Sequence, residues 1–160
     1  MAIRGTEKPN DSCDREIVIS RIFDAPREMV WDAWTDPEKI VRWWGPGGFS
    51  LTVHEMDVRP GGVWKSTMHG PDGTDYLNDC VFIEVVKPER IVYHLSGGRT
   101  EGRDSNAEVS WIFEAMGSRT RLTLRMVYPT AEALAHSLEK YGVVQGGNET
   151  LDRLQNYVTR

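Results

Sequence analysis

Between Phe49 and Val127 the sequence contains six short stretches in which apolar and polar residues alternate, and one long helical pattern follows them. The clearest stretch places Val109, Trp111 and Phe113 on one side. Because successive side chains of a strand point to opposite faces, each stretch predicts a strand with one apolar and one polar face. Short turns between the stretches predict an antiparallel meander. A meander whose partner helix comes last is expected to curve around that helix and leave a cavity between them, which makes this an α+β protein.

A further strand and two short helices are predicted before the meander. The strand covers 16–24, and Pro26 is expected to be the first residue of a helix. In Asp36-Pro37-Glu38 the aspartate can cap a second helix, the proline presets φ, and the glutamate faces the positive helix end. This second helix is expected to end near Trp44, before Gly45-Pro46-Gly47-Gly48.

Two irregularities are expected. The alternation slips near His54, which predicts a β-bulge. In the last helix the apolar stripe from Leu134 to Val158 lacks its members at Gly147 and Asn148, and Gly142 and Gly146 lie nearby. Each glycine inside a helix costs about 1 kcal/mol relative to alanine. We therefore expect a short or bent first part and then a firm helix from about 143 to 158.

Size and charge restrict the class of protein. The chain has 160 residues, which indicates one domain over 15–160 after a polar, flexible tail over 1–14. Its net charge is −5, so no nucleic-acid partner is expected. Two cysteines without a CxxC pair indicate a reducing compartment. The start of the chain has no apolar core of a secretion signal, and no apolar run approaches the roughly 20 residues that cross a bilayer. We expect a cytoplasmic protein with no membrane span.

Several stretches resemble a known family. They are PEKIVRWWGPGGF, DVRPGGVWKSTMHGPDG, VKPERIVY and GGNETLDRLQNYV. They are similar to the START-like (SRPBCC) superfamily and, more narrowly, to homologues of the activator of heat-shock-protein-90 ATPase. The resemblance covers roughly residues 15–158 and implies a helix-grip fold, in which a curved antiparallel sheet grips a long C-terminal helix and two small helices follow the first strand. It also implies a cavity for apolar or aromatic ligands, although such folds serve many functions.

The chain departs from this family at one position. Members usually carry a Gly-Trp pair inside the last helix, facing the cavity mouth. Here Gly147 stands where the tryptophan is expected. The loss of an indole should enlarge the pocket or let another side chain fold into the space.

The predicted pocket residues combine inward aromatic, polar and helical positions. Aromatic residues on apolar strand faces can serve the core, the pocket wall or both. Asn148 and Ser66 are the polar candidates for orienting a ligand, and a satisfied amide near a helix bend is the alternative for Asn148. Two interpretations of the adjacent Trp43 and Trp44 stay open. In the favoured one, Trp43 plugs the sheet and Trp44 packs on the following loop; in the other, one of them is partly exposed near the cavity entrance and serves a partner surface. The complete set is Trp43, Trp64, Ser66, Met68, Tyr93, Trp111, Phe113, Tyr141, Gly147, Asn148 and Leu151.

No pattern in the sequence names a reaction. The four histidines lack the spacing of metal ligands, and no G-x-S-x-G elbow is present, so we predict no catalytic residue, metal or cofactor. The leading hypothesis is a binding protein for a small apolar or aromatic molecule. The ligand would enter between the 97–106 loop, the Trp-Trp-Gly-Pro corner and the glycine-rich part of the last helix.

Two other functions stay open. A cyclase, dehydratase or hydrolase could use the same cavity if two polar side chains converge inside it. A co-chaperone-like interaction module ranks lowest, because the resemblance implies that the activators act with an additional domain, for which this chain has no room. A homodimer through a sheet edge also stays open.

Overall fold

The computed structural model describes residues 15–97, 107–141 and 143–159; for residues 96, 97, 140, 141 and 143 it describes the backbone alone. The predicted tail over 1–14 lies outside these ranges. The strands are β1 (Glu16–Phe23), β2 (Ser50–Met56), β3 (Val63–His69), β4 (Asp75–Val86), β5 (Arg90–Gly97), β6 (Ala107–Met116) and β7 (Arg119–Val127). The helices are α1 (Arg27–Thr35), α2 (Pro37–Ile40), α4 (Ala131–Tyr141) and α5 (Val143–Thr159).

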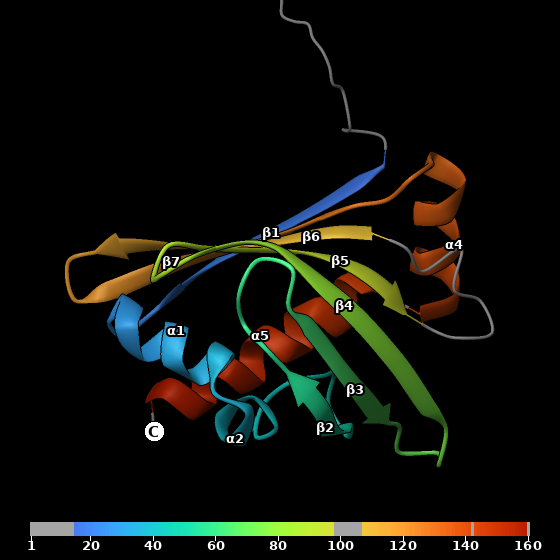
Figure 1. The fold of residues 1–160 in the computed structure, drawn as a ribbon, viewed down its shortest axis with the longest axis horizontal. Coiled ribbons are helices and arrows are strands. Elements are labelled where there is room, and N and C mark those ends of the chain that lie inside the picture. Colours follow the sequence, from blue (N-terminus) through green and yellow to red (C-terminus); the bar gives the residue numbers. More distant parts are fainter. Residues whose placement is uncertain (1–14, 98–106, 142, 160) are drawn as a thin grey trace, which may run out of the picture.

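The described strands form one curved antiparallel sheet in the order β1-β7-β6-β5-β4-β3-β2. Strands β2 to β7 follow one another as the predicted meander, and β1 joins beside β7. Helices α1, α2 and α5 lie on the concave side of the sheet, with α4 beyond one end (Figure 1). The α+β helix-grip architecture is confirmed. The prediction of a homodimer concerns β1 and β2, which are the edge strands.

Alternation decides which face of the sheet is buried. In β6 the side chains of Val109, Trp111 and Phe113 are buried, and on β7 their cross-strand partners include Leu124 and Leu122, which are also buried. Residues directly opposite in an antiparallel pair contact each other, so these rows form a continuous apolar surface toward the helices. This surface is the sheet's contribution to the core.

Two bulges disturb the alternation. The register shifts between Val53 and Glu55, which confirms the bulge predicted near His54. A second shift lies between Phe82 and Glu84 and was not predicted. It explains why the end of β4 lacks a clear period: Phe82 is buried and Ile83 is 51% exposed, but the next three residues, 84–86, are all half-buried.

The short helices differ from the prediction at their ends. Pro26 is the N-cap of α1 and not its first helical residue. Asp36 caps α2 as expected, since its Oδ1 accepts a hydrogen bond from the Glu38 N–H at 2.9 Å. The helix ends at Ile40, not near Trp44, and the chain continues as turns in which the Trp44 N–H donates to the Ile40 carbonyl at 3.0 Å. These turns give the two tryptophans different directions.

The closing helical region consists of α4 and α5, which run in different directions (Figure 1). The start of α5 at Val143 agrees with the expected firm helix. Its backbone comes closest to the sheet at β1. A β-carbon placed at Gly147 would lie 2.9 Å from Ile19 Cδ1 of β1, so the absence of a side chain at 147 permits this approach.

Candidate functional site

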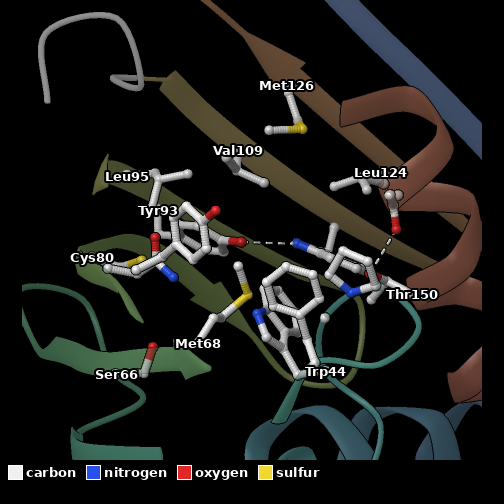
Figure 2. Close-up of a pocket in the computed structure, with 18 of the residues that line it drawn as sticks. Trp44, Ser66, Met68, Cys80, Tyr93, Leu95, Val109, Leu124, Met126 and Thr150 are labelled. Atoms are coloured by element: carbon white, nitrogen blue, oxygen red, sulfur yellow. Dashed lines mark hydrogen bonds between the residues drawn. The ribbon is translucent and has the colours of Figure 1, made fainter. Parts of the chain in front are cut away.

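A cavity of about 320 Å³ lies between the sheet, α5 and the loop after α2. This volume is within the range of small-molecule sites. Figure 2 shows the labelled side chains around one space, with Thr150 of α5 across from Ser66, Met68 and Cys80 of β3 and β4. The lining residues are Trp44, Gly45, Pro46, Phe49, Trp64, Ser66, Met68, Tyr76, Asn78, Cys80, Tyr93, Leu95, Val109, Trp111, Leu124, Met126, Tyr128, Ser137, Gly146, Gly147 and Thr150.

Three tryptophans form one wall of the cavity. The ring centre of Trp44 lies 4.9 Å from that of Trp64 and 5.5 Å from that of Trp111. Trp34 of α1 lies behind them, with its ring 5.2 Å from Trp64 and 5.9 Å from Trp111. The Trp44–Trp111 pair is tilted and the other three contacts are edge-to-face, and aromatic contacts at such distances stabilise clusters beyond area burial alone. The wall is therefore a packed part of the core that continues into the cavity lining.

The remaining polar lining groups come mainly from β3, β4 and β5. Ser66 and Asn78 lie directly opposite each other on β3 and β4. The Tyr93 hydroxyl of β5 accepts a hydrogen bond from Trp111 Nε1–H at 3.2 Å. On α5 the Thr150 hydroxyl donates to the Gly146 carbonyl at 2.8 Å. The cavity therefore has a polar strip on one side and the apolar ends of β6 and β7 on another.

Burial keeps the titratable lining groups neutral. It raises the pKa of the Cys80 thiol, and the nearby Asp79 carboxylate adds to the increase. Burial also raises the pKa of the Tyr93 and Tyr128 hydroxyls. Burial away from water destabilises the ionised form of each of these three groups, so they stay protonated near pH 7. Among the residues that the structure describes, none of those that line the cavity is Asp, Glu, Lys, Arg or His.

Arg153 of α5 fixes the loop that closes one side of the cavity. Its Nη1 group donates to the carbonyls of Gly45 and Pro46, each at 2.9 Å, and to the Trp44 carbonyl at 3.3 Å. Burial lowers the pKa of Arg153. Because Trp44, Gly45 and Pro46 all line the cavity, this side chain positions part of the wall from outside it.

Six of the eleven predicted pocket residues lie on the cavity wall: Trp64, Ser66, Met68, Tyr93, Trp111 and Gly147. The side chain of Tyr141 lies outside the described residues, as do positions 98–106 of the expected entrance. The other two parts of that entrance, around Trp44–Pro46 and Gly146–Gly147, do line the cavity. At Gly147 the space is shared with Ile19, in agreement with the second of the two expected consequences.

Four predicted residues lie elsewhere. Trp43 is fully buried and its Nε1–H donates to the Ala33 carbonyl at 2.9 Å, so it anchors α1, and Trp44 takes the place in the wall. Phe113 packs against Trp31, with ring centres 5.2 Å apart, beyond the end of the cavity. Leu151 is fully buried in the core and does not line the cavity.

Asn148 also points away from the cavity. Its Oδ1 accepts a hydrogen bond from Arg21 of β1 at 3.3 Å, and its Nδ2 donates to the Val144 carbonyl at 3.0 Å. Both ends of the amide therefore have partners, as the alternative of a satisfied amide expects.

Sequence reasoning missed several wall residues. Val109, Leu124 and Met126 lie on the same strand faces as predicted residues, and the alternation was a sufficient signal for them. Asn78 alternates with Cys80 and faces Ser66, which was also readable. Nothing in the local pattern singled out Ser137 of α4, because its place depends on how the helix sits against the sheet.

The histidines take part in other contacts. His54 Nε2 lies 2.8 Å from Thr67 Oγ1, and His69 lies between Thr52 and Asp75, with 2.8 Å to each. Within the described ranges, no three His, Cys, Asp or Glu side chains are grouped so that they could hold a metal ion. None of the described helices has both the length and the apolar character required to cross a membrane.

Comparisons with known proteins agree with this geometry. The family described as "Activator of Hsp90 ATPase homolog 1-like protein" matches residues 24–159. The crystal structure of protein Ms6760 from Mycobacterium smegmatis is 26% identical, with a TM-score of 0.83 and 93% of each chain covered. The solution structure of a protein from Arthrobacter aurescens is 23% identical, with a TM-score of 0.85 and coverage of 94% of this chain and 90% of that one.

A third structure is that of the AHSA1 protein from Silicibacter pomeroyi. It is 22% identical, with a TM-score of 0.71, and the match covers 88% of this chain and 95% of that one. The two relatives below 25% identity support the fold alone. A comparison with curated proteins found no significant match.

Proposed function

We propose that this chain, which belongs to the Activator of Hsp90 ATPase homolog 1-like protein family, binds a small apolar or aromatic molecule in the cavity between the sheet and α5. The observation that carries the proposal is a cavity of about 320 Å³ with a largely apolar and aromatic lining. Sites for small molecules are concave and mostly apolar, with a few polar groups that set orientation. This cavity has that composition.

Burial of ligand surface would supply most of the affinity. Each Å² of apolar surface removed from water contributes about 25 cal/mol, less the cost of restricting the ligand. The tryptophan wall is already packed on Trp34, so little of it has to be ordered when a ligand enters. A rigid, preformed wall reduces the entropic cost of binding.

The lining favours binding over acid–base catalysis. A cyclase, dehydratase or hydrolase would need a general base in the cavity. The described lining residues supply no carboxylate or imidazole, and burial raises the pKa of the Cys80, Tyr93 and Tyr128 groups, which keeps them from acting as bases near pH 7. We therefore favour ligand binding over catalysis as the function of this cavity.

The test uses naphthalene as the ligand and the indole N–H signals of the ¹⁵N-labelled protein as the readout. We expect saturable shifts for Trp44 and Trp111, which line the cavity, and small shifts for Trp31, which does not. Val109→Phe should weaken binding by roughly tenfold or more, since its ring would occupy the cavity. Val81→Phe makes the same change at a side chain that is 46% exposed on β4, and it should bind like the parent protein.

Absence of saturable shifts in the parent protein would overturn the proposal, and so would unchanged affinity in Val109→Phe. Native mass spectrometry of the purified protein is a second measurement, because a retained molecule would appear as a defined mass difference.

A further inference from the structure

The cavity contains a pair of polar side chains that have no hydrogen-bond partner among the residues that the structure describes. Ser66 of β3 and Asn78 of β4 are direct cross-strand partners, and both line the cavity. Side chains opposite each other in an antiparallel pair have β-carbons about 4.5–5.5 Å apart, so both can reach one ligand atom or two adjacent ones. Within the described part of the chain, neither side chain forms a hydrogen bond or an ion pair. Ser66 is nevertheless only 3% exposed.

Several other polar groups around the cavity are engaged, whereas the buried Trp64 Nε1–H has no partner among the described residues. The Thr150 hydroxyl donates to the Gly146 carbonyl, the Trp111 N–H donates to the Tyr93 hydroxyl, and Ser137 bonds to Tyr128. A buried polar group without a partner destabilises a protein, and the great majority have one. Ser66 is buried, Asn78 is half-buried, and neither has a partner among the described residues, so this pair marks the place where a bound molecule would contribute hydrogen bonds.

The chemistry of the lining limits the class of ligand. No charged side chain among the described lining residues could pair with a carboxylate, a phosphate or an ammonium group, so an ion would lose its hydration without compensation. A serine hydroxyl donates and accepts, and an asparagine amide offers two donors and one acceptor. Both match a neutral hydroxyl or carbonyl oxygen. The tryptophan wall of Trp44, Trp64 and Trp111 suits the face or edge of an aromatic ring.

We infer that Ser66 and Asn78 form the specificity-determining edge of this cavity, and that its ligands are uncharged aromatic molecules carrying a hydroxyl or carbonyl group. This inference rests on the proposed function. It adds a hydrogen-bonding requirement that apolar burial alone does not impose.

The test compares two probes of nearly equal shape, 2-naphthol and 2-methylnaphthalene, by titration of the ¹⁵N-labelled protein. The methyl compound is the more hydrophobic, so burial alone predicts that it binds at least as tightly as the naphthol. We expect the naphthol to bind the parent protein roughly tenfold more tightly, as a satisfied buried hydrogen bond allows.

The double variant Ser66→Ala with Asn78→Leu should bring the affinity ratio of the two probes to about one, while 2-methylnaphthalene binds at least as well as before. Ser66→Ala alone removes a single oxygen without changing the shape of the wall, and it should lower the ratio even if Asn78→Leu disturbs the sheet. The control is Ser110→Ala on β6, a position outside the cavity lining, and it should leave the ratio unchanged.

The outcomes separate the two proposals. If both probes bind equally well to the parent protein, or if the preference for naphthol survives in the variants, the Ser66–Asn78 inference is wrong and ligand binding stands. If neither probe binds saturably, the proposed function fails and the inference fails with it.

Discussion

Replacement of Arg153 by methionine should destabilise the protein through the loop that carries Trp44. One nitrogen carries two protons, and two of the three acceptors lie at 2.9 Å, so we count two well-formed hydrogen bonds from Nη1. A hydrogen bond to a charged group contributes about 1.5–3 kcal/mol when buried. Arg153 is only partly buried, so we reduce this to about 1 kcal/mol for each bond. Methionine keeps most of the aliphatic stem, so packing is largely retained.

The expected loss is therefore about 2 kcal/mol in the free energy of unfolding, measured by urea titration with an unchanged slope. Since the slope of a domain of this size is about 2 kcal/mol per M, the midpoint should fall by about 1 M. Arg153→Lys should lie between the two proteins, because an ammonium group still donates but lacks the guanidinium geometry. Naphthalene should also bind Arg153→Met more weakly, since the loop that carries Trp44 loses the donor that holds its carbonyls in place.

The matched control is Arg59→Met. Arg59 bonds Asp57 at 2.7 Å, but its side chain is 72% exposed, and such pairs contribute about 0–1 kcal/mol. If the stabilities of Arg153→Met and Arg59→Met differ by less than about 0.5 kcal/mol, the argument that Arg153 holds the loop is wrong.

Three further predictions concern backbone space, pH and packing. Gly62→Ala should cost roughly 3 kcal/mol or more in urea unfolding, because its β-carbon would lie 2.0 Å from the Asp57 carbonyl oxygen, whereas Gly61→Ala, with φ +84° and open space, should cost about 1 kcal/mol. Burial raises the pKa of Cys80 above its ordinary value of 9.0, so the unfolded chain releases this proton first and stability should fall as pH rises above about 9. At about pH 9.5 the thiol accounts for a loss of about 0.8 kcal/mol; urea midpoints with equal pH dependence in Cys80→Ala and the parent would contradict this. Leu151→Ala should lose about 2–5 kcal/mol by thermal or urea unfolding because Leu151 is fully buried, and a loss below about 1 kcal/mol would mean that the α5 core is misplaced.

Local patterns in the sequence determined the elements of the fold. Alternation identified the strands of the meander, and the slip near His54 located a bulge, because the direction of a strand side chain depends on its immediate neighbours. Asp36 identified a helix start for the same reason, since a cap joins atoms only two residues apart. The wall residues Trp64, Ser66 and Trp111 were predictable because each lies on the inner face of a regular strand.

Tertiary structure decided the choices that alternation and helical spacing leave open. Trp43 and Trp44 are adjacent in irregular turns. The hydrogen bond to the Ala33 carbonyl sets the place of Trp43, and the contact with Trp64 sets that of Trp44. The apolar stripe of α5 includes both the core residue Leu151 and the cavity residue Gly147. Which of the two lines the cavity depends on how α5 packs against the sheet, where Gly147 lies next to Ile19. Asn148 accepts a hydrogen bond from Arg21, which is more than a hundred residues away in sequence. Contacts between distant segments depend on how whole elements pack, and no local period records them.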